Sequence, residues 1–152
     1  MSSTADAEIR SLVSRYAQAT NGFDAAAWSA TWAEEGAWEL MGATRTGRAA
    51  VVAQWEALMG NIQFVYQLPG EGSIEIDGGE KRATGRFPTV EFCKLDDGPG
   101  TLMLGTYHDV YVIEGGAWRF AERRMKIGYM GPTDMSGAPI PTLEPTPEHT
   151  PE

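Results

Sequence analysis

The sequence is short of the residues that build cross-links and metal centres. It has one cysteine, Cys93, so no disulfide can form within the chain and a cysteine-based zinc site is excluded. Its two histidines, His108 and His149, and the scattered carboxylates show no spacing typical of a metal-binding triad. No glycine-rich phosphate loop follows a predicted strand. We therefore expect neither a metal ion nor another cofactor.

Basic residues are also few. Twelve Lys and Arg stand against 21 Asp and Glu, which gives a net charge of −9. A nucleic-acid-binding protein needs a basic surface, and an acidic surface repels anionic membranes, so neither partner is expected. No apolar run approaches the roughly 20 residues that cross a membrane. The N-terminus also lacks the basic and then apolar pattern of a signal peptide, and these absences together predict a cytoplasmic protein.

The first 60 residues show the periodicity of helices. Apolar residues from Ile9 to Tyr16 recur at helical spacing and predict an amphipathic helix over about residues 5–20. A second helix is predicted after Asp24, with Trp28, Thr31 and Trp32 on one face, and a third after Gly47. With 42% hydrophobic residues in a chain of 152, one domain with a substantial core is expected.

After residue 60 the period changes from 3.6 to 2, which predicts strands. The predicted strands cover residues 73–76, 81–95, 101–114 and 117–129, and residues 37–40 alternate like a further short strand before the third helix. Helices followed by a meander of long strands indicate an α+β fold. Six of the nine prolines lie in the last 21 residues, so we expect a domain over residues 1–131 and an extended or disordered tail over residues 132–152.

Four short motifs support a more specific assignment. They are Tyr16 followed eight positions later by Asp24, Ile74-Glu75-Ile76-Asp77-Gly78, Gly105-Thr106-Tyr107-His108-Asp109, and Gly116-Ala117-Trp118-Arg119-Phe120-Ala121-Glu122-Arg123. With this order of elements, residues 5–130 resemble the SnoaL-like branch of the NTF2-like superfamily. The resemblance implies a cone in which three helices pack on the concave face of a strongly curved mixed or antiparallel sheet of four to six strands. Such a cone encloses one pocket.

Within this branch the sequence looks closest to dehydratase and dehydrochlorinase-like lyases. Those enzymes place an aspartate at the helix joint, a histidine at the mouth of the first long strand and an arginine on the last strand. Asp24 matches the aspartate, and Arg124 matches the arginine by its spacing from Trp118. The histidine position falls on Gln67, whose neutral amide forms hydrogen bonds but does not exchange a proton near neutral pH.

The same analogy predicts which residues line the pocket. Strand side chains alternate between two faces, and the resemblance implies that Leu104, Thr106 and His108 face inward. His108 would then supply the titrating group that Gln67 lacks. Trp38 and Met103 are further expected pocket liners, because adaptable, polarizable side chains suit flat apolar ligands.

Simpler structural roles compete with these functional ones. Asp24 precedes three alanines and is also a suitable N-cap for the second helix. Tyr16 is equally well explained as a half-buried core residue, and His108 as a hydrogen-bonded structural histidine. Arg124 is also expected as one half of an ion pair with Glu122 or a neighbour.

The sequence thus predicts a cofactor-independent lyase acting on a small, mostly apolar, ring-bearing molecule. It would eliminate water, a halide or a small carbon fragment such as formaldehyde. Asp24 would be the base and His108 the second proton-handling group, with Tyr16, Gln67 or Arg124 stabilising the developing charge. An isomerase or cyclase is the nearest alternative, and a non-enzymatic ligand-binding or interaction module is the other.

A homo-oligomer, most simply a dimer, is expected as well. Tyr107 and Tyr111 are predicted to lie on the outer face of the sheet, where exposed apolar groups favour burial against a second copy.

Overall fold

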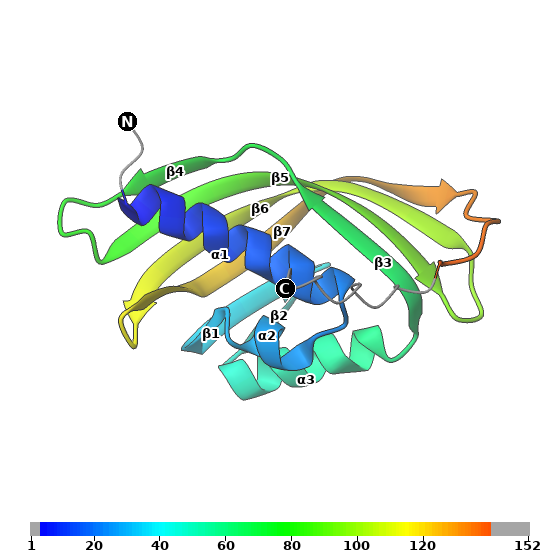
Figure 1. Ribbon diagram of the computed structural model, residues 1–152, viewed down its shortest axis with the longest axis horizontal. Helices are drawn as coiled ribbons and strands as arrows, with labels where there is room; N and C mark the ends of the chain where they lie inside the picture. The colour runs from blue at the N-terminus through cyan, green and yellow to red at the C-terminus, as the bar shows by residue number, and fades with distance from the viewer. Residues whose placement is uncertain (1–3, 141–152) are drawn as a thin grey trace, which may run out of the picture.

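The computed structural model describes residues 4–140, which form three helices and seven strands (Figure 1). The helices are α1 (Thr4–Asn21), α2 (Ala25–Ser29) and α3 (Arg48–Met59). The strands are β1 (Trp32–Leu40), β2 (Ala43–Thr46), β3 (Ile62–Pro69), β4 (Ser73–Ile76), β5 (Arg82–Leu95), β6 (Gly100–Glu114) and β7 (Ala117–Thr133).

All seven strands belong to one mixed sheet with the order β2-β1-β7-β6-β5-β3, and β4 pairs with β5 beyond this path. Every pairing is antiparallel except that of β1 with β7, which is parallel. The long strands β5, β6 and β7 curve, and α1 crosses their concave side, while α2 and α3 lie beside β1 and β2 (Figure 1). The α+β cone with helices against a curved mixed sheet is confirmed.

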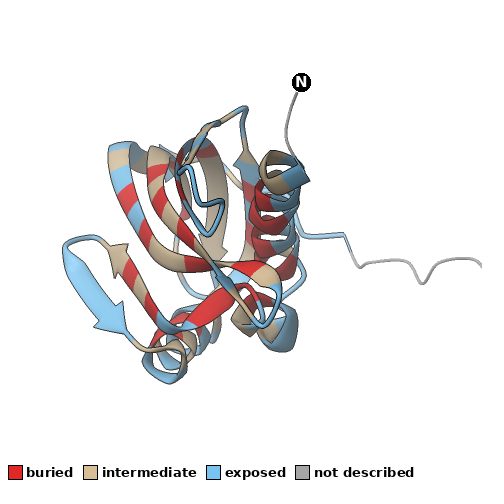
Figure 2. Ribbon diagram, turned by 90° about the vertical axis from the view of Figure 1, so that its left-hand side faces the viewer, coloured by how far each residue is buried: buried red, intermediate tan, exposed pale blue. Residues whose placement is uncertain are grey.

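The core lies between α1 and the concave face of the sheet, which we call the inner face. One stripe of α1, from Ile9 through Leu12 to Tyr16, is almost completely buried because it faces the sheet. On the long strands buried residues alternate with exposed ones, as the banding in Figure 2 shows. The inner side chains of the strands and the buried stripe of α1 thus form one continuous apolar cluster.

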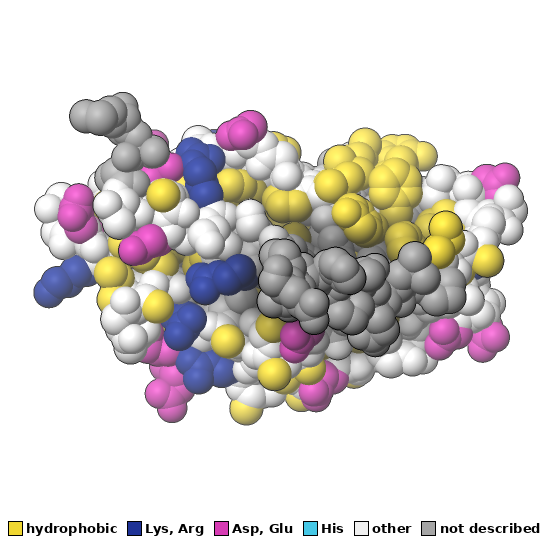
Figure 3. All heavy atoms as spheres, viewed as in Figure 1, with side chains coloured by type: hydrophobic (Ala, Val, Ile, Leu, Met, Phe, Trp, Pro, Cys, Tyr) yellow, Lys and Arg dark blue, Asp and Glu magenta, His cyan; other side chains and the backbone are white. Residues whose placement is uncertain are grey.

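The opposite, outer face of the sheet also carries apolar side chains at one end. Leu68, Val90, Leu104 and Tyr129 form one row across β3, β5, β6 and β7. Three of these, Leu68, Leu104 and Tyr129, are 40–54% exposed. Hydrophobic side chains gather in this region, over β3 and β5, in Figure 3.

Several predicted boundaries needed correction. The sheet has seven strands rather than four to six, because β2 and β3 were not predicted. The strand predicted over residues 37–40 is present as the end of β1, which begins earlier, at Trp32. The second helix ends after one turn, at Ser29. The carbonyl of Thr31 accepts a hydrogen bond from the backbone N–H of Phe120 at 2.9 Å, so the chain joins the sheet where a continued helix had been expected.

The predicted tail begins within the sheet. Pro132 lies in β7 opposite Thr101 of β6. The described pairing of β7 with β1 ends at Arg124, so at Pro132 β1 offers no carbonyl that would need the N–H that proline lacks. Residues 134–140 then pass Lys94, whose Nζ donates to the carbonyls of Met135 and Gly137 at 2.9 and 3.2 Å. The remaining part of the predicted tail, 141–152, lies outside the described residues.

Candidate functional site

A group of polar side chains interrupts the apolar inner face. Arg123 on β7 donates from Nε and Nη2 to the two carboxylate oxygens of Asp109 on β6, at 2.8 and 3.1 Å. The hydroxyl of Tyr111 donates to the same carboxylate at 2.7 Å. Arg123 is 1% exposed and Asp109 is 3% exposed. A bidentate pair with a third hydrogen bond compensates the two charges for their loss of hydration.

Aromatic rings enclose the guanidinium of Arg123. The ring centres of Tyr107, Phe120 and Tyr16 lie 3.8, 4.2 and 4.3 Å from its Cζ atom. Attraction between the cation and the ring faces adds to the Asp109 bond. Burial lowers the pKa of Arg123, but Asp109 and the two tyrosines more than reverse this, so the pKa is raised and the charge is retained.

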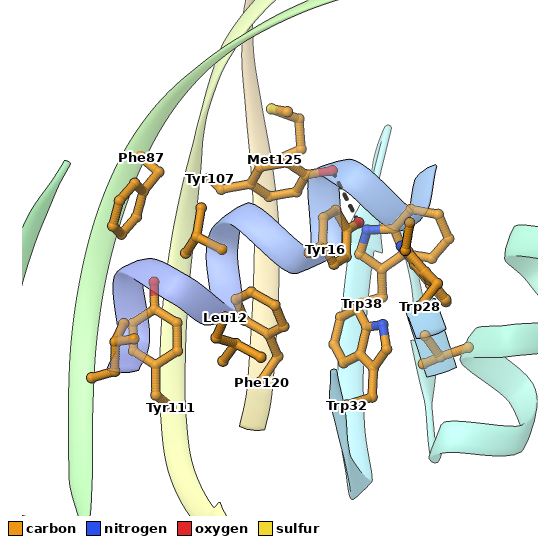
Figure 4. Packing of buried hydrophobic residues seen from close by; sticks show 14 of the residues in the cluster. Leu12, Tyr16, Trp28, Trp32, Trp38, Phe87, Tyr107, Tyr111, Phe120 and Met125 are labelled. Atoms are coloured by element: carbon orange, nitrogen blue, oxygen red, sulfur yellow. Dashed lines mark hydrogen bonds between the residues drawn. The ribbon is translucent and has the colours of Figure 1, made fainter. Parts of the chain in front are cut away.

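Two tyrosine hydroxyls meet beside this cation. The hydroxyls of Tyr16 on α1 and Tyr107 on β6 lie 3.4 Å apart (Figure 4), longer than the usual 2.7–2.8 Å of such a bond. Burial raises the pKa of both tyrosines, and Arg123 lowers it only in part. Both hydroxyls therefore stay protonated near neutral pH. Since one proton serves the mutual bond, the other can be donated to a guest molecule.

The indole N–H groups around Tyr16 also lack acceptors. The ring centres of Trp28 and Trp32 lie 5.4 and 6.3 Å from that of Tyr16, and Trp38 packs against Trp28 at 5.4 Å. Within residues 4–140, the Nε1 atoms of these three tryptophans are buried without a hydrogen-bond partner. The aromatic interior is thus rich in donors, and unsatisfied buried donors are unusual away from sites that receive another molecule.

A carboxylate and an amide face this interior from the other end of the sheet. Gln67 on β3 and Glu91 on β5 are register partners, and Gln67 Nε2 donates to Glu91 Oε2 at 2.6 Å. Glu91 is half-buried. Burial raises its pKa, and the hydrogen bond from Gln67 lowers it only in part. Glu91 shares the inner face with Tyr107, and its charge adds to the burial that raises the pKa of Tyr16 and of Tyr107.

The end of α1 reaches this pair through Asn21. Its Nδ2 donates to the carbonyl of Gln67 at 3.1 Å, and its Oδ1 accepts from the Gln67 backbone N–H at 2.7 Å. These two bonds fix β3 to the C-terminus of the helix. The side chain that meets Gln67 at the helix joint is therefore the neutral Asn21.

Four of the predicted site residues lie in the interior. Tyr16, Gln67, Trp38 and Met103 are all less than 8% exposed. Tyr16 and Trp38 are part of the aromatic cluster that fills the cone, and Met103 lies opposite Glu91 in the register. Their catalytic or binding roles remain predictions.

The other four predicted residues lie outside this interior. Asp24 is exposed, and its Oδ1 accepts from the Ala27 backbone N–H at 3.0 Å, so it caps α2. The expectation that Leu104, Thr106 and His108 face inward is wrong, because the buried Tyr107 and the equally buried Asp109 alternate with them along β6. Arg124 is also on the outer face.

The neighbours of these outer residues confirm their position. Arg124 forms the predicted alternative contact, an ion pair with Glu122 at 2.9 Å. His108 has Arg86 and Arg124 as its register partners on β5 and β7. Its partial burial, together with Lys126 and these two arginines, lowers its pKa.

An irregularity in β7 explains why Arg123 rather than Arg124 faces inward. Trp118 and Phe120 are buried, and simple alternation would place Arg124 on the same side. The register with β6 shifts at this point because Ala121 is an extra residue between the partners of Tyr111 and Val110. An extra residue of this kind, a β-bulge, shifts the alternation of side chains by one position, so Arg123 faces inward and Arg124 outward.

The faces of β6 were also assigned the wrong way round. Tyr107 and Tyr111 were predicted on the outer face and are instead 3% and 0% exposed on the inner one. Both pack against aromatic residues of the core, Tyr107 against Tyr16 and Tyr111 against Phe120.

Sequence reasoning also missed Arg123, Asp109 and Glu91. For Glu91 a signal was present, since the odd positions of β5 carry small or apolar residues and the even ones carry the basic residues. Glu91 is the charged residue in the odd series, which marks it as an inward-facing exception. For Asp109 and Arg123 no local signal was available, because their pairing depends on the bulge.

Across residues 4–140, no group of three His, Cys, Asp or Glu side chains could hold a metal ion. No helix in the same range is both long and apolar enough to span a membrane.

The curved mixed sheet with helices on its concave side defines an NTF2-like fold. The family model of the SnoaL-like domain matches residues 1–124. The chain therefore belongs to the SnoaL-like family, as the sequence motifs indicated. No curated protein matches it.

Solved structures of similar fold include two proteins with enzymatic names. A scytalone dehydratase-like protein from Novosphingobium aromaticivorans is 18% identical with a TM-score of 0.77, covering 91% of this chain and 94% of its own. The hexachlorocyclohexane dehydrochlorinase LinA-type3 from Novosphingobium barchaimii is 16% identical with a TM-score of 0.77, covering 90% and 94%. At such identities the likeness shows the fold alone.

A third structure is more similar in sequence than these two. It is a variant of Rv3472 of Mycobacterium tuberculosis, a protein of unknown function. It is 29% identical with a TM-score of 0.71, covering 80% of this chain and 74% of its own.

Proposed function

We propose that this protein is an acid–base enzyme of the lyase kind, acting on a small, mostly apolar, ring-bearing molecule. The reaction would eliminate water, a halide or a small carbon fragment such as formaldehyde. The observation that supports this most directly is the pair of buried hydroxyls of Tyr16 and Tyr107 beside Arg123.

This pair suits the stabilisation of developing negative charge. A protonated phenol in a water-poor interior donates a strong hydrogen bond to an oxygen or halide that gains charge. The neighbouring Arg123 strengthens such a donor because its positive charge stabilises negative charge that develops nearby. Its own position is fixed by Asp109, so little reorganisation accompanies the reaction.

The surroundings of the hydroxyl pair favour an aromatic or alicyclic ligand with an acceptor atom. The walls are indole and phenol rings, and the unpartnered indole N–H groups of Trp28, Trp32 and Trp38 offer further donors. Met103 and Met125, two adaptable side chains, are buried in the same cluster and can shift to admit a guest. Isomerisation or cyclisation uses the same parts and stays the nearest alternative.

A non-enzymatic ligand-binding module is the second candidate. Two observations favour it, namely that Asp24 caps its own helix and that the neutral Asn21 at the helix joint meets the neutral Gln67 of β3. In that case the donors of the interior would hold a ligand without changing it.

A screen of hydroxylated and halogenated ring compounds distinguishes these functions. Binding is followed by quenching of tryptophan fluorescence and turnover by product formation. We expect turnover of at least one compound, and Tyr107→Phe should lower kcat about 100-fold, since loss of one such donor typically costs roughly 10²–10³. The matched control is Tyr129→Phe, which removes the hydroxyl of a tyrosine that is 54% exposed on the outer face.

The outcomes separate the two functions clearly. Binding of several compounds without any turnover would support the binding module. An equal loss in the Tyr107 and Tyr129 variants would remove the interior hydroxyl pair from the mechanism.

A further inference from the structure

We propose that Glu91 on strand β5 is the catalytic base of this site. The proposal rests on the function proposed above. It assigns the proton transfer to a residue of the sheet rather than to Asp24 at the helix joint, which the sequence predicts as the base.

The geometry of Glu91 suits this role. Its side chain faces inward between Thr89 and Cys93, which lie on the same face of β5. Gln67 holds one carboxylate oxygen at 2.6 Å, which leaves the second oxygen without a hydrogen-bond donor among residues 4–140. Glu91 is half-buried, so its carboxylate keeps some contact with solvent.

The other candidate bases are less well placed. Asp24 lies outside the interior and accepts a backbone hydrogen bond from its own helix. His108 points to the outer face among basic neighbours. Asp109 is inside, but Arg123 and Tyr111 occupy both of its oxygens. Of the two inward-facing carboxylates described here, Glu91 is therefore the one that retains an available oxygen.

The residues at the helix joint hold this base in place. Asn21 fixes the backbone of Gln67 through two hydrogen bonds, and the side chain of Gln67 then fixes Glu91. Neither amide titrates near neutral pH. Asn21 and Gln67 thus act as positioning residues that orient a carboxylate one strand away.

The elimination can be written with its protons and electrons balanced. The carboxylate of Glu91 takes a proton from a substrate carbon, and the electrons of that C–H bond form the new double bond. The bond from the adjacent carbon to the leaving group breaks, and its electrons depart with that group. A leaving hydroxyl takes the proton of Tyr16 or Tyr107 and becomes water. The proton on Glu91 then returns to the tyrosinate, which restores the site.

The groups that face Glu91 allow a simple pH dependence. They are Gln67 from β3, Cys93 from β5, Tyr16 from α1 and Tyr107 from β6. Burial and, secondarily, Glu91 raise the pKa of the Cys93 thiol to about 11, and both tyrosines are also shifted upward. Glu91 is therefore the group among them that titrates in the acid to neutral range. The rate should rise with pH through a value above that of an ordinary glutamate.

A base-catalysed ring opening tests the proposal directly. The probe is 5-nitrobenzisoxazole, a small flat molecule from which a base removes the ring C–H proton. The electrons of that bond form a nitrile, and the N–O bond breaks to release a coloured phenolate. We expect wild-type protein to open this ring, and Glu91→Gln to lower the rate at least about 100-fold, the usual contribution of a positioned base. The matched control is Glu75→Gln on the exposed face of β4.

A measurement without turnover shows whether Glu91 is buried as described. Its raised pKa means that the folded protein holds the proton more tightly than the unfolded chain. The contribution of Glu91 to stability is therefore full below the unfolded pKa and is lost as the pH rises through the folded pKa. Glu91→Gln keeps an acceptor for Gln67 and should be more stable than wild type above that pH, with the difference shrinking in acid. Glu75→Gln should show no such trend.

Each outcome bears on a different statement. Equal ring opening by wild type and Glu91→Gln would overturn Glu91 as the base while leaving the acid–base function intact. Loss of ring opening in Asp24→Asn, with full activity in Glu91→Gln, would return the base to the helix joint. Binding of the probe without ring opening by any variant would overturn both this proposal and the proposed function.

Discussion

The two faces of the sheet differ in the burial and pairing of their charged side chains, although residues of the two faces alternate along the same strands. On the inner face Arg123 and Asp109 are buried and fully paired. On the outer face Arg86, His108 and Arg124 form one row across three strands. Arg124 of this row forms an exposed ion pair with Glu122.

This contrast teaches which charges can take part in chemistry. Outer charges are screened by water and salt, so their effect on one another is small. Inner charges act over short distances in a medium of low dielectric constant, where the same separation has a larger effect. A titratable group on the inner face, such as Glu91, is therefore better suited to catalysis than His108 on the other side.

The largest effect should follow from breaking the inner ion pair. Asp109→Ala leaves Arg123 buried without its carboxylate, and loss of one member of a buried pair costs about 3–5 kcal/mol. Denaturant unfolding measures the change. Replacing both charges, as Asp109→Leu with Arg123→Met, should recover part of the loss. A double variant no more stable than Asp109→Ala would show that the unpaired charge is not the cause.

The next effect concerns the apolar end of the outer face. The row that contains Leu68, Leu104 and Tyr129 leaves apolar surface in contact with water. A two-fold axis parallel to the sheet would pack this row against the same row of a second copy, since such an axis brings identical patches together. We expect a homodimer in light scattering.

Leu104→Glu tests this arrangement because it places a charge in the centre of the row. We expect it to give the monomer mass of 16.5 kDa without a change in secondary structure. A wild-type monomer at micromolar concentration would contradict the dimer.

A smaller effect should separate capping from catalysis at Asp24. Asp24→Ala removes the acceptor for the Ala27 N–H, and loss of such a cap costs about 1 kcal/mol. Asp24→Asn keeps an acceptor and should retain most of the stability in thermal unfolding. If Asp24→Asn nevertheless abolishes turnover, the carboxylate itself is needed, and the predicted role of Asp24 as the base is supported.

The smallest effect is expected at His108 on the outer face. His108→Gln should change the free energy of unfolding by less than about 0.5 kcal/mol. Because the pKa of His108 is lowered by folding, its contribution to stability falls as the pH drops through the ordinary histidine range. His108→Gln should remove this pH-dependent part in thermal unfolding at several pH values. A large loss of turnover would instead support the predicted proton-handling role.

Much of the fold could be predicted from the sequence because its signals are local. The apolar spacing from Ile9 to Tyr16 defines α1, and the Gly115-Gly116 turn defines the hairpin of β6 and β7. The five-residue helix α2 could not be predicted in this way. Its end is set by the pairing of Trp32 with Phe120, which lies far along the chain.

The site was harder to predict because it depends on which face each residue occupies. Both faces of β6 carry apolar residues, so its sequence does not distinguish the face of Tyr107 from that of His108. For β7 the alternation from Trp118 gives the wrong answer beyond Ala121. The inward-facing positions were therefore assigned to residues one place away from those that face inward, such as His108 for Tyr107 and Arg124 for Arg123.

The extra residue Ala121 also affects how this chain is compared with its relatives. In an alignment with a relative whose last strand lacks it, each later residue of β7 is matched to a counterpart on the opposite face unless a gap is placed there. Deletion of this one alanine would close the bulge and leave Arg123 inside and Arg124 outside, because Phe120 and Glu122 would then follow the simple alternation. A bulge at this point thus allows one residue to be gained or lost from the strand while the set of interior groups is kept.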